Sequence, residues 1–166
     1  KWMSNQVHHA IWHRETYSAE GVLECLSGMP FDVEFISFDD VKKGIPKDIR
    51  VIINVGDAYT SFSGAENWID EAVVTTLRQF VDEGGGFIGV GEPTAYQHQG
   101  RFFQLADVLG VDREMGFSLS TDKYNEKNPQ HFILEDIEGD IDFGEGTTRI
   151  YAQGDHYQIL AMDGEY

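Results

Sequence analysis

The chain has 166 residues, of which 41% are hydrophobic and 13% aromatic, as expected for one globular domain with a substantial core. Twelve basic residues against 29 acidic ones give a formal net charge of −17 at pH 7. Because nucleic acids and anionic membranes are bound through basic patches, this charge argues against both kinds of partner. No apolar run approaches the roughly 20 residues of a membrane span. The single cysteine, Cys25, excludes an intrachain disulfide and fits a cytoplasmic protein.

The first half of the chain alternates between predicted helices and strands. A helix is expected over residues 18–26 and ends near a Ser-Gly-Met-Pro turn. Short apolar alternation then predicts a strand over 32–38. The run Val51–Val55 is continuously apolar except for one asparagine, as in a strand covered on both faces.

The middle of the chain continues the alternation. Apolar residues three to four positions apart predict a helix over residues 66–83. Ser63 or Gly64 is expected to cap its start, and the glycines at 84–86 are expected to end it. A strand over 87–90 and a helix over 102–108 follow. Strand–helix–strand order with short connections predicts parallel strands in a doubly wound, three-layer α/β domain.

The last third of the chain changes character. Short apolar runs at 131–134, 149–152 and 157–161 are separated by turns rich in Gly and Asp. We expect them to form a small antiparallel β extension near the C-terminus. The polar stretch 118–130 is expected to be a loop.

Two predicted strands end in a glycine followed by an acid, at Gly56-Asp57 and Gly91-Glu92. The carboxyl ends of parallel strands meet at one edge of the sheet, where ligands bind in this class of domain. The alternative is a well-ordered loop that closes on itself by hydrogen bonds and salt bridges. The residues predicted to face a substrate or an interface at this edge are Asp57, Glu92, Tyr96, His98 and Arg101.

The glycine-rich turn after residue 90 argues against a nucleotide cofactor. Glu92 and Pro93 stand where a phosphate would be held, and a carboxylate repels pyrophosphate while proline removes a backbone donor. The tip of this turn is Gly91, which carries no side chain, so the turn presents no nucleophile. We predict no catalytic residue in this chain.

The sequence predicts neither a metal site nor a reactive thiol. His9 and His13 have the spacing of a helical metal pair, but no His-Glu-x-x-His pattern accompanies them. Cys25 belongs to an apolar pattern and has no base beside it in sequence, so we expect a buried, inert side chain.

Long stretches of the chain carry a specific resemblance. Residues 85–116, which contain Gly-Val-Gly-Glu-Pro at 89–93, are similar to the middle domain of bacterial galacto-N-biose/lacto-N-biose phosphorylases. These are the 1,3-β-galactosyl-N-acetylhexosamine phosphorylases of glycoside hydrolase family 112. Residues 26–40 and 51–57 resemble the same domain, and the similarity extends over roughly residues 1–162.

The resemblance implies a fold and a place in a larger protein. Family members have a catalytic (β/α) barrel, then a class I glutamine amidotransferase-like (flavodoxin-like) domain, then β-rich material. The whole chain, 1–166, would be that single middle domain, and its sheet would lack its first strand or borrow a substitute. Gly91 takes the position where a working amidotransferase carries its cysteine, so no glutaminase thioester can form.

The resemblance also implies a reaction for the parent enzyme. Phosphate attacks the anomeric carbon of a β-1,3-galactosyl-N-acetylhexosamine, and a carboxylic acid of the barrel protonates the leaving oxygen. The parent needs no cofactor beyond phosphate as substrate. This domain would be a structural and interaction domain that packs on the barrel and on another subunit. The alternatives are a self-contained sugar or small-molecule domain, or the corresponding domain of a galactosyl-rhamnose phosphorylase.

Overall fold

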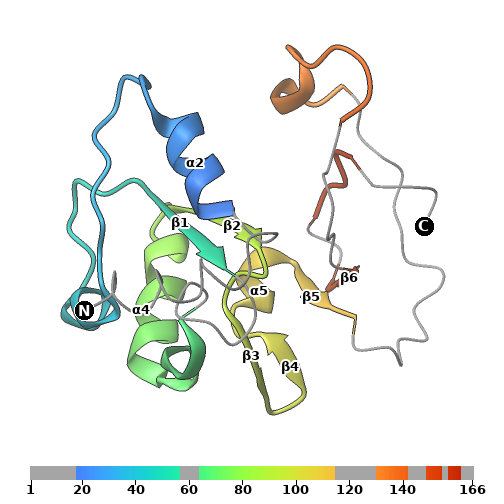
Figure 1. Cartoon of the computed structure of the whole chain (residues 1–166). Coiled ribbons are helices and arrows are strands. Elements are labelled where there is room, and N and C mark those ends of the chain that lie inside the picture. Colours follow the sequence, from blue (N-terminus) through green and yellow to red (C-terminus); the bar gives the residue numbers. More distant parts are fainter. Residues whose placement is uncertain (1–17, 57–63, 115–129, 142–148, 155–156, 162–166) are drawn as a thin grey trace.

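The computed structural model describes residues 18–56, 64–114, 130–141, 149–154 and 157–161. Figure 1 shows their arrangement and labels the main helices and strands. In chain order the elements are α2 (Ser18–Leu26), α3 (Phe38–Lys43), β1 (Val51–Gly56), the 3-10 helix η1 (Ala65–Ile69), α4 (Glu71–Asp82), β2 (Gly86–Gly91), β3 (Ala95–His98), β4 (Arg101–Phe103), α5 (Ala106–Leu109), β5 (Val111–Arg113), the 3-10 helix η2 (Phe132–Leu134) and β6 (Ile150–Ala152).

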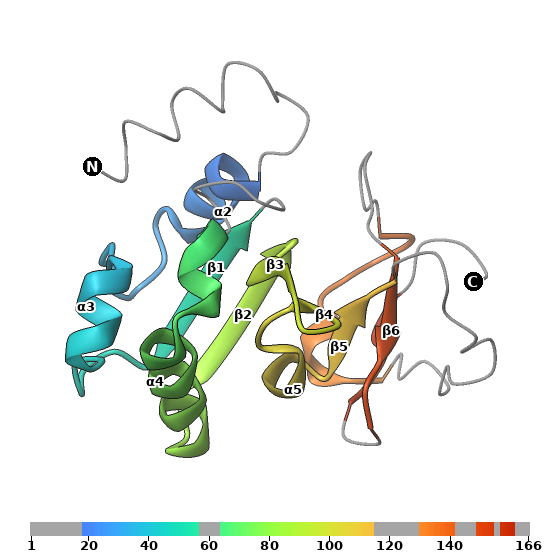
Figure 2. The same cartoon turned by 90° about the horizontal axis from the view of Figure 1, so that it is seen from below.

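The strands β1 and β2 pair in parallel, as predicted, with Val51 opposite Gly86 and Gly56 opposite Gly91. Helix α4 lies against one face of this pair (Figure 2). Ile52 and the neighbouring Phe87 pack from the strands onto the core below. The buried members of that core are Val41, Trp68, Val73, Leu77 and Leu105.

The predicted helix over 66–83 is two elements. The 3-10 helix η1 ends at Ile69, and α4 begins after Asp70. Asp70 caps α4 because its Oδ1 accepts the N–H of Ala72 at 3.0 Å, and a carboxylate at this position also favours the helix dipole. Lys42 of α3 lies 2.6 Å from Asp70 and holds the pKa of that carboxyl below its usual range. The cap at Asp70 therefore starts a new helix within the apolar pattern that predicted one continuous helix over residues 66–83.

The predicted end of this helix is confirmed. Gly84 has a φ of +98°, and its N–H donates to the carbonyl of Val81 at 2.9 Å. The N–H of Gly85 donates to the carbonyl of Phe80, also at 2.9 Å. This pair of bonds is a Schellman motif, which glycine favours because it enters the left-handed region without steric cost.

The strand predicted over 32–38 is wrong. No strand is assigned there, and Phe38 is the first residue of α3. Ser37 and Asp40 form a reciprocal capping box, each side chain accepting the other's backbone N–H. The Ser37 hydroxyl also donates to Oδ2 of Asp40, and this bond, together with the one from the Ser37 N–H, lowers the pKa of Asp40 to about 2. The capping signal outweighs the short apolar alternation that precedes it.

The helix predicted over 102–108 is also wrong in its first half. Arg101–Phe103 is strand β4, which pairs with β3 in an antiparallel hairpin. The helical part is the short α5, and it ends before Gly110, as expected. The two-residue turn Gln99-Gly100 has positive φ at both positions, the geometry that best joins two antiparallel strands.

The antiparallel extension is present in a reduced form. Strand β6 falls within the predicted run 149–152 and pairs with β5, a strand that the sequence analysis did not predict. Residues 132–134 are the 3-10 helix η2 instead of a strand, started by His131, whose Nδ1 accepts the N–H of Ile133 at 3.3 Å. No strand is assigned over 157–161. Of the predicted loop 118–130, all but the last residue lie outside the described residues.

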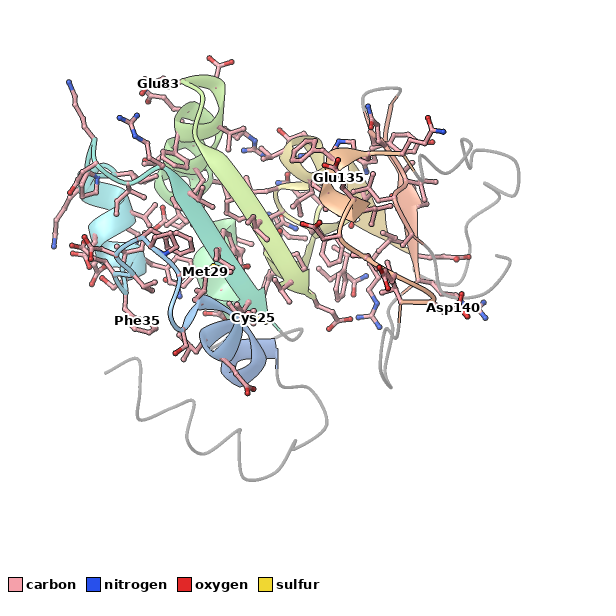
Figure 3. The ribbon with its side chains drawn as sticks, turned by 90° about the horizontal axis from the view of Figure 1, so that it is seen from above. Cys25, Met29, Phe35, Glu83, Glu135 and Asp140 are labelled. Atoms are coloured by element: carbon pink, nitrogen blue, oxygen red, sulfur yellow. The ribbon has the colours of Figure 1, made fainter. Side chains whose placement is uncertain are left out.

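Two further observations bear on the sequence-based expectations. Cys25 is exposed on α2, so the expected buried position is wrong (Figure 3). The nine-residue helix α2 contacts β1 but leaves the apolar Leu23 46% exposed. No helix in the described part of the chain is long and apolar enough to cross a membrane. The doubly wound, three-layer arrangement stays a prediction.

Candidate functional site

The carboxyl ends of the two predicted strands lie side by side at one edge of the sheet, as expected. Gly56 and Gly91 are register partners at the carboxyl ends of β1 and β2. Directly after β2, the N–H of Glu92 donates to the carbonyl of Gly56 at 2.8 Å. Asp57, the other predicted residue at this edge, lies outside the described residues.

The turn after β2 folds back tightly over the sheet. A Cβ on Gly89 would lie 2.5 Å from Cγ of Pro93, so this close approach needs glycine. Thr94 is fully buried and has a φ of +55°, an uncommon value for a β-branched residue. Its N–H donates to Oδ1 of Asn54 at 2.8 Å, and its Oγ1 accepts the N–H of Leu105 at 3.3 Å. These bonds hold the strained residue in place.

Glu92 faces an internal partner. Its Oε1 lies 2.6 Å from the guanidinium of Arg113 on β5, and its side chain is only 12% exposed. Cζ of Arg113 lies 4.5 Å from the centre of the Phe102 ring, a cation–π arrangement that restricts the guanidinium further. The carboxylate that sequence analysis offered to a ligand is therefore part of a salt bridge between the turn and β5.

Next to Arg113, Asp112 organises the backbone. This carboxylate is 1% exposed, and it accepts the N–H groups of Phe102, Phe103 and Arg113, the shortest at 2.7 Å. A buried carboxylate is stable only when such donors satisfy it. Asp112 thus connects β4 to β5. The sequence analysis missed this residue, although an acidic residue that directly follows the apolar Val111 and precedes a basic residue interrupts the apolar pattern and could have been noticed.

His98 and Arg101 lie opposite each other at the end of the β3–β4 hairpin. Both are exposed, as are the two turn residues between them. Arg101 also approaches Asp107, with 3.9 Å between Nη1 and Oδ1. His98 and Arg101 form a polar tip on the hairpin. This tip shares no residue with the Glu92–Arg113 salt bridge.

Tyr96 has a structural position. Its side chain is half-buried and packs on the core that contains Leu105. Its carbonyl accepts a hydrogen bond of 2.6 Å from Nε2 of Gln104, which also reaches the carbonyl of Arg101 at 3.3 Å. Of the four described candidates, the structure therefore pairs only His98 with Arg101 and gives Glu92 and Tyr96 neighbours that hold the fold together.

A second ion pair fastens this region to α4. Arg78 donates to both oxygens of Asp107, from Nε at 2.7 Å and from Nη2 at 3.0 Å, and also to the carbonyl of Gln104. The guanidinium holds the pKa of Asp107 below its usual range. Neither residue was predicted, because they belong to different elements and no local spacing connects them.

The described residues contain no cluster of three or more His, Cys, Asp or Glu side chains that could hold a metal ion. His9 and His13, the metal pair considered in the sequence, lie outside the described residues. Chemically, the region is an α/β sheet edge whose turn is bonded to β1, to Leu105 and to β5, and it presents a glycine where such turns can present a nucleophile. These observations define the class of the protein as an α/β domain with a closed carboxyl-edge turn.

The comparison with known families places this domain. The chain belongs to the family of the lacto-N-biose phosphorylase central domain, whose model matches residues 1–166. A 1,3-β-galactosyl-N-acetylhexosamine phosphorylase of Lachnoclostridium phytofermentans is 58% identical over 99% of this chain and 23% of its own length. The enzyme of that name from Bifidobacterium longum is 41% identical over 98% of this chain and 26% of its own.

A more distant relative has a different printed substrate. A D-galactosyl-β-1→4-L-rhamnose phosphorylase of Lachnoclostridium phytofermentans is 37% identical over 79% of this chain and 18% of its own length. The chain thus spans about a quarter or less of the length of these curated relatives. The match to the middle domain of a phosphorylase, expected from the sequence, is confirmed.

Proposed function

We propose that this chain is a non-catalytic structural and interaction domain of a phosphorylase that acts on β-1,3-galactosyl-N-acetylhexosamines. The observation that carries the proposal is the 58% identity with a phosphorylase of that specificity over 99% of the chain. The relative named as a D-galactosyl-β-1→4-L-rhamnose phosphorylase, at 37% identity over a shorter stretch, supports the alternative substrate less well.

The proposed reaction of the whole enzyme is reversible phosphorolysis. A phosphate oxygen forms a bond to the anomeric carbon of galactose while the glycosidic bond to the N-acetylhexosamine breaks. A carboxylic acid gives its proton to the leaving oxygen, which yields α-galactose 1-phosphate and free N-acetylhexosamine. Inorganic phosphate is a substrate here, and the scheme requires no cofactor.

The non-catalytic role is supported by how the described polar residues are used. Glu92 is engaged by Arg113 at 2.6 Å, and Asp112 by three backbone N–H groups. A general acid must reach the leaving oxygen of the substrate, within about 3 Å, and these carboxylates are already committed to the fold. The acid and the phosphate-binding groups are then supplied by a catalytic barrel of the same polypeptide.

We also propose that the domain has the class I glutamine amidotransferase-like, flavodoxin-like fold. In support, β1 and β2 are parallel, and the turn after β2 has its tip at Gly91, with a φ of +71°. A cysteine nucleophile would stand at this tip in a working glutaminase. The expected partners are the barrel and a second subunit, and the single cysteine of the chain fits a cytoplasmic enzyme.

The test is a phosphorolysis assay on the full-length enzyme with galacto-N-biose and phosphate. His98→Ala and Arg101→Ala alter exposed residues, so we expect kcat and KM to stay within about twofold of the parent values. The 166-residue chain by itself should release no galactose 1-phosphate. A fall in kcat of about 100-fold in either variant would assign catalysis to the hairpin and contradict the proposal.

The second candidate is a sugar-binding role of the hairpin tip, favoured by the exposed His98 and Arg101 side by side. It predicts a different kinetic signature. The two alanine variants would then raise KM for the disaccharide without changing kcat, because they would remove binding that is equal in ground and transition states.

A further inference from the structure

The outer edge of β1 is unpaired within the described residues. Its inner edge bonds β2, with the carbonyls of Arg50 and Gly56 accepting from Gly86 and Glu92. Bonding direction alternates along a strand, so the N–H and C=O groups of even-numbered residues point to β2. Those of the odd-numbered residues Val51, Ile53 and Val55 point to the outer edge, where the sheet has no further strand in the described part of the chain.

Strand β1 has the composition of an internal strand. Its sequence, Val-Ile-Ile-Asn-Val-Gly, contains no charged residue and no proline, and its register with β2 is unbroken by a bulge. Natural edge strands often carry a charged residue, a proline or a bulge, because these features prevent an apolar edge from pairing with other strands. Purely parallel sheets also occur almost only with both faces covered, and two strands alone are marginally stable.

The surface next to this edge is apolar. Val51 is 49% exposed, and so is Ile88 on the same face of the pair, opposite α4. The chain between α2 and α3 runs on the side of β1 away from β2 (Figures 1 and 2), and Figure 3 labels Met29 and Phe35 there. These two side chains are 51% and 67% exposed, and Phe31 between them is 55% exposed.

We propose that the outer edge of β1 receives a β-strand from the part of the same polypeptide that lies outside these 166 residues. The incoming strand bonds the backbone of Val51, Ile53 and Val55 and covers the apolar side chains beside them, as in other cases of strand addition. The inference rests on the proposed function in one respect, since it needs a longer polypeptide. The relative that is 58% identical is more than four times as long as the stretch it shares with this chain, which spans 23% of it.

The charge of the chain argues against a second copy as the occupant. Pairing two β1 edges would bring together two domains that each carry a formal charge of −17. Like-charge repulsion of this size opposes association, whereas a strand of the same polypeptide is held at high effective concentration by its covalent connection.

Residue-resolved amide hydrogen exchange of the full-length protein tests the pairing. The amides of Ile52 and Asn54 bond β2 and serve as an internal control for a folded sheet. We expect the amides of Ile53 and Val55 to exchange at least about 100-fold more slowly than unbonded amides, close to the control pair. Fast exchange at Ile53 and Val55 with slow exchange at Ile52 and Asn54 would overturn the proposal.

A photo-crosslinker at Val51 identifies the occupant. The residue is half-exposed, so replacement by p-benzoylphenylalanine in the full-length protein leaves the β1–β2 pair intact. We expect a cross-link to a segment outside the 166 residues. A cross-link within the 166 residues, or one to a second copy whose yield falls on dilution, overturns the proposal. Because phosphorolysis is assayed separately, loss of the docking and loss of the proposed function are distinguished.

Discussion

Two neighbouring regions of this domain are stabilised in different ways. The β1–β2 pair with α4 is held by apolar side chains, with Val73 and Leu77 almost fully buried between helix and strands. The region from β3 to β5 has a small apolar cluster of its own, but its path is set by polar side chains bonded to backbone. Asp112 and Thr94 are the clearest of these. The structure of the first region is determined by the periodic spacing of apolar residues, and that of the second region is determined by individual hydrogen bonds.

The largest expected effect is on the apolar region. Leu77 is 2% exposed, so Leu77→Ala should lower the free energy of unfolding by about 3 kcal/mol through lost burial and the cavity left behind. Urea-induced unfolding measures the change. Ile69→Ala, at a side chain that is 41% exposed, is the control and should cost less than about 1 kcal/mol. Equal losses in the two variants would contradict the assignment of the core.

The next effect is on the polar region. Asp112→Ala removes a buried acceptor of three backbone N–H groups, and should cost about 2 to 3 kcal/mol, because buried donors are left unsatisfied. Asp112→Asn keeps one acceptor oxygen and should cost less. Asp107→Ala is the control at an exposed carboxylate. If Asp112→Ala proved as mild as Asp107→Ala, the β3 to β5 region would depend on apolar contacts after all.

A smaller effect concerns the ion pair between the two regions. Arg78 lowers the pKa of Asp107, so the unfolded chain binds a proton at this residue more readily than the folded domain does. The pair therefore stabilises the fold above about pH 4 and loses its contribution as pH falls through the lowered pKa. Since Asp107 is 46% exposed, the contribution should stay below about 1 kcal/mol.

The variant Asp107→Asn isolates this contribution. Stability should depend less on pH below about pH 4 in the variant than in the parent, because the titrating group is gone. Urea unfolding at a series of pH values makes the comparison. An unchanged acid limb would show that the two regions are not coupled by this pair.

The smallest expected effect is at the hairpin turn. Gln99 has a φ of +50°, and asparagine tolerates the left-handed region better than glutamine, so Gln99→Asn should stabilise the domain by about 0.5 kcal/mol. The matched control, Gln97→Asn on strand β3, should give no gain, since asparagine is disfavoured in strands. Thermal unfolding detects the difference. A gain at both positions would argue against turn strain.

The sequence-based predictions succeeded where an apolar pattern extended over several residues or where glycine ended a helix. The runs at β1 and β2, the bounds of α2, and the end of α4 at Gly84 were all predicted. They failed where one local group decided the structure. The capping box of Ser37 and Asp40 started a helix at the end of an expected strand, and the turn Gln99-Gly100 converted the start of an expected helix into a hairpin.

The candidate site shows the same division. That Glu92 follows the carboxyl end of β2 could be predicted from chain order, because parallel strands place their ends at one edge. That Glu92 meets Arg113 could not, since the guanidinium comes from β5, a strand that the apolar pattern did not indicate. Nor did any spacing in the sequence connect Arg78 with Asp107.

By itself the sequence determined the acidic, globular character of the chain, the parallel β1–β2 pair and the kinship to a phosphorylase domain. These properties depend on composition, on the spacing of apolar residues and on long motifs, all of which can be identified in the sequence without the structure. Tertiary structure alone decided whether a carboxylate faces a ligand or closes a turn. That choice depends on which donors come within about 3 Å after folding, and for Glu92 and Asp112 the donors belong to segments distant in sequence or to the backbone.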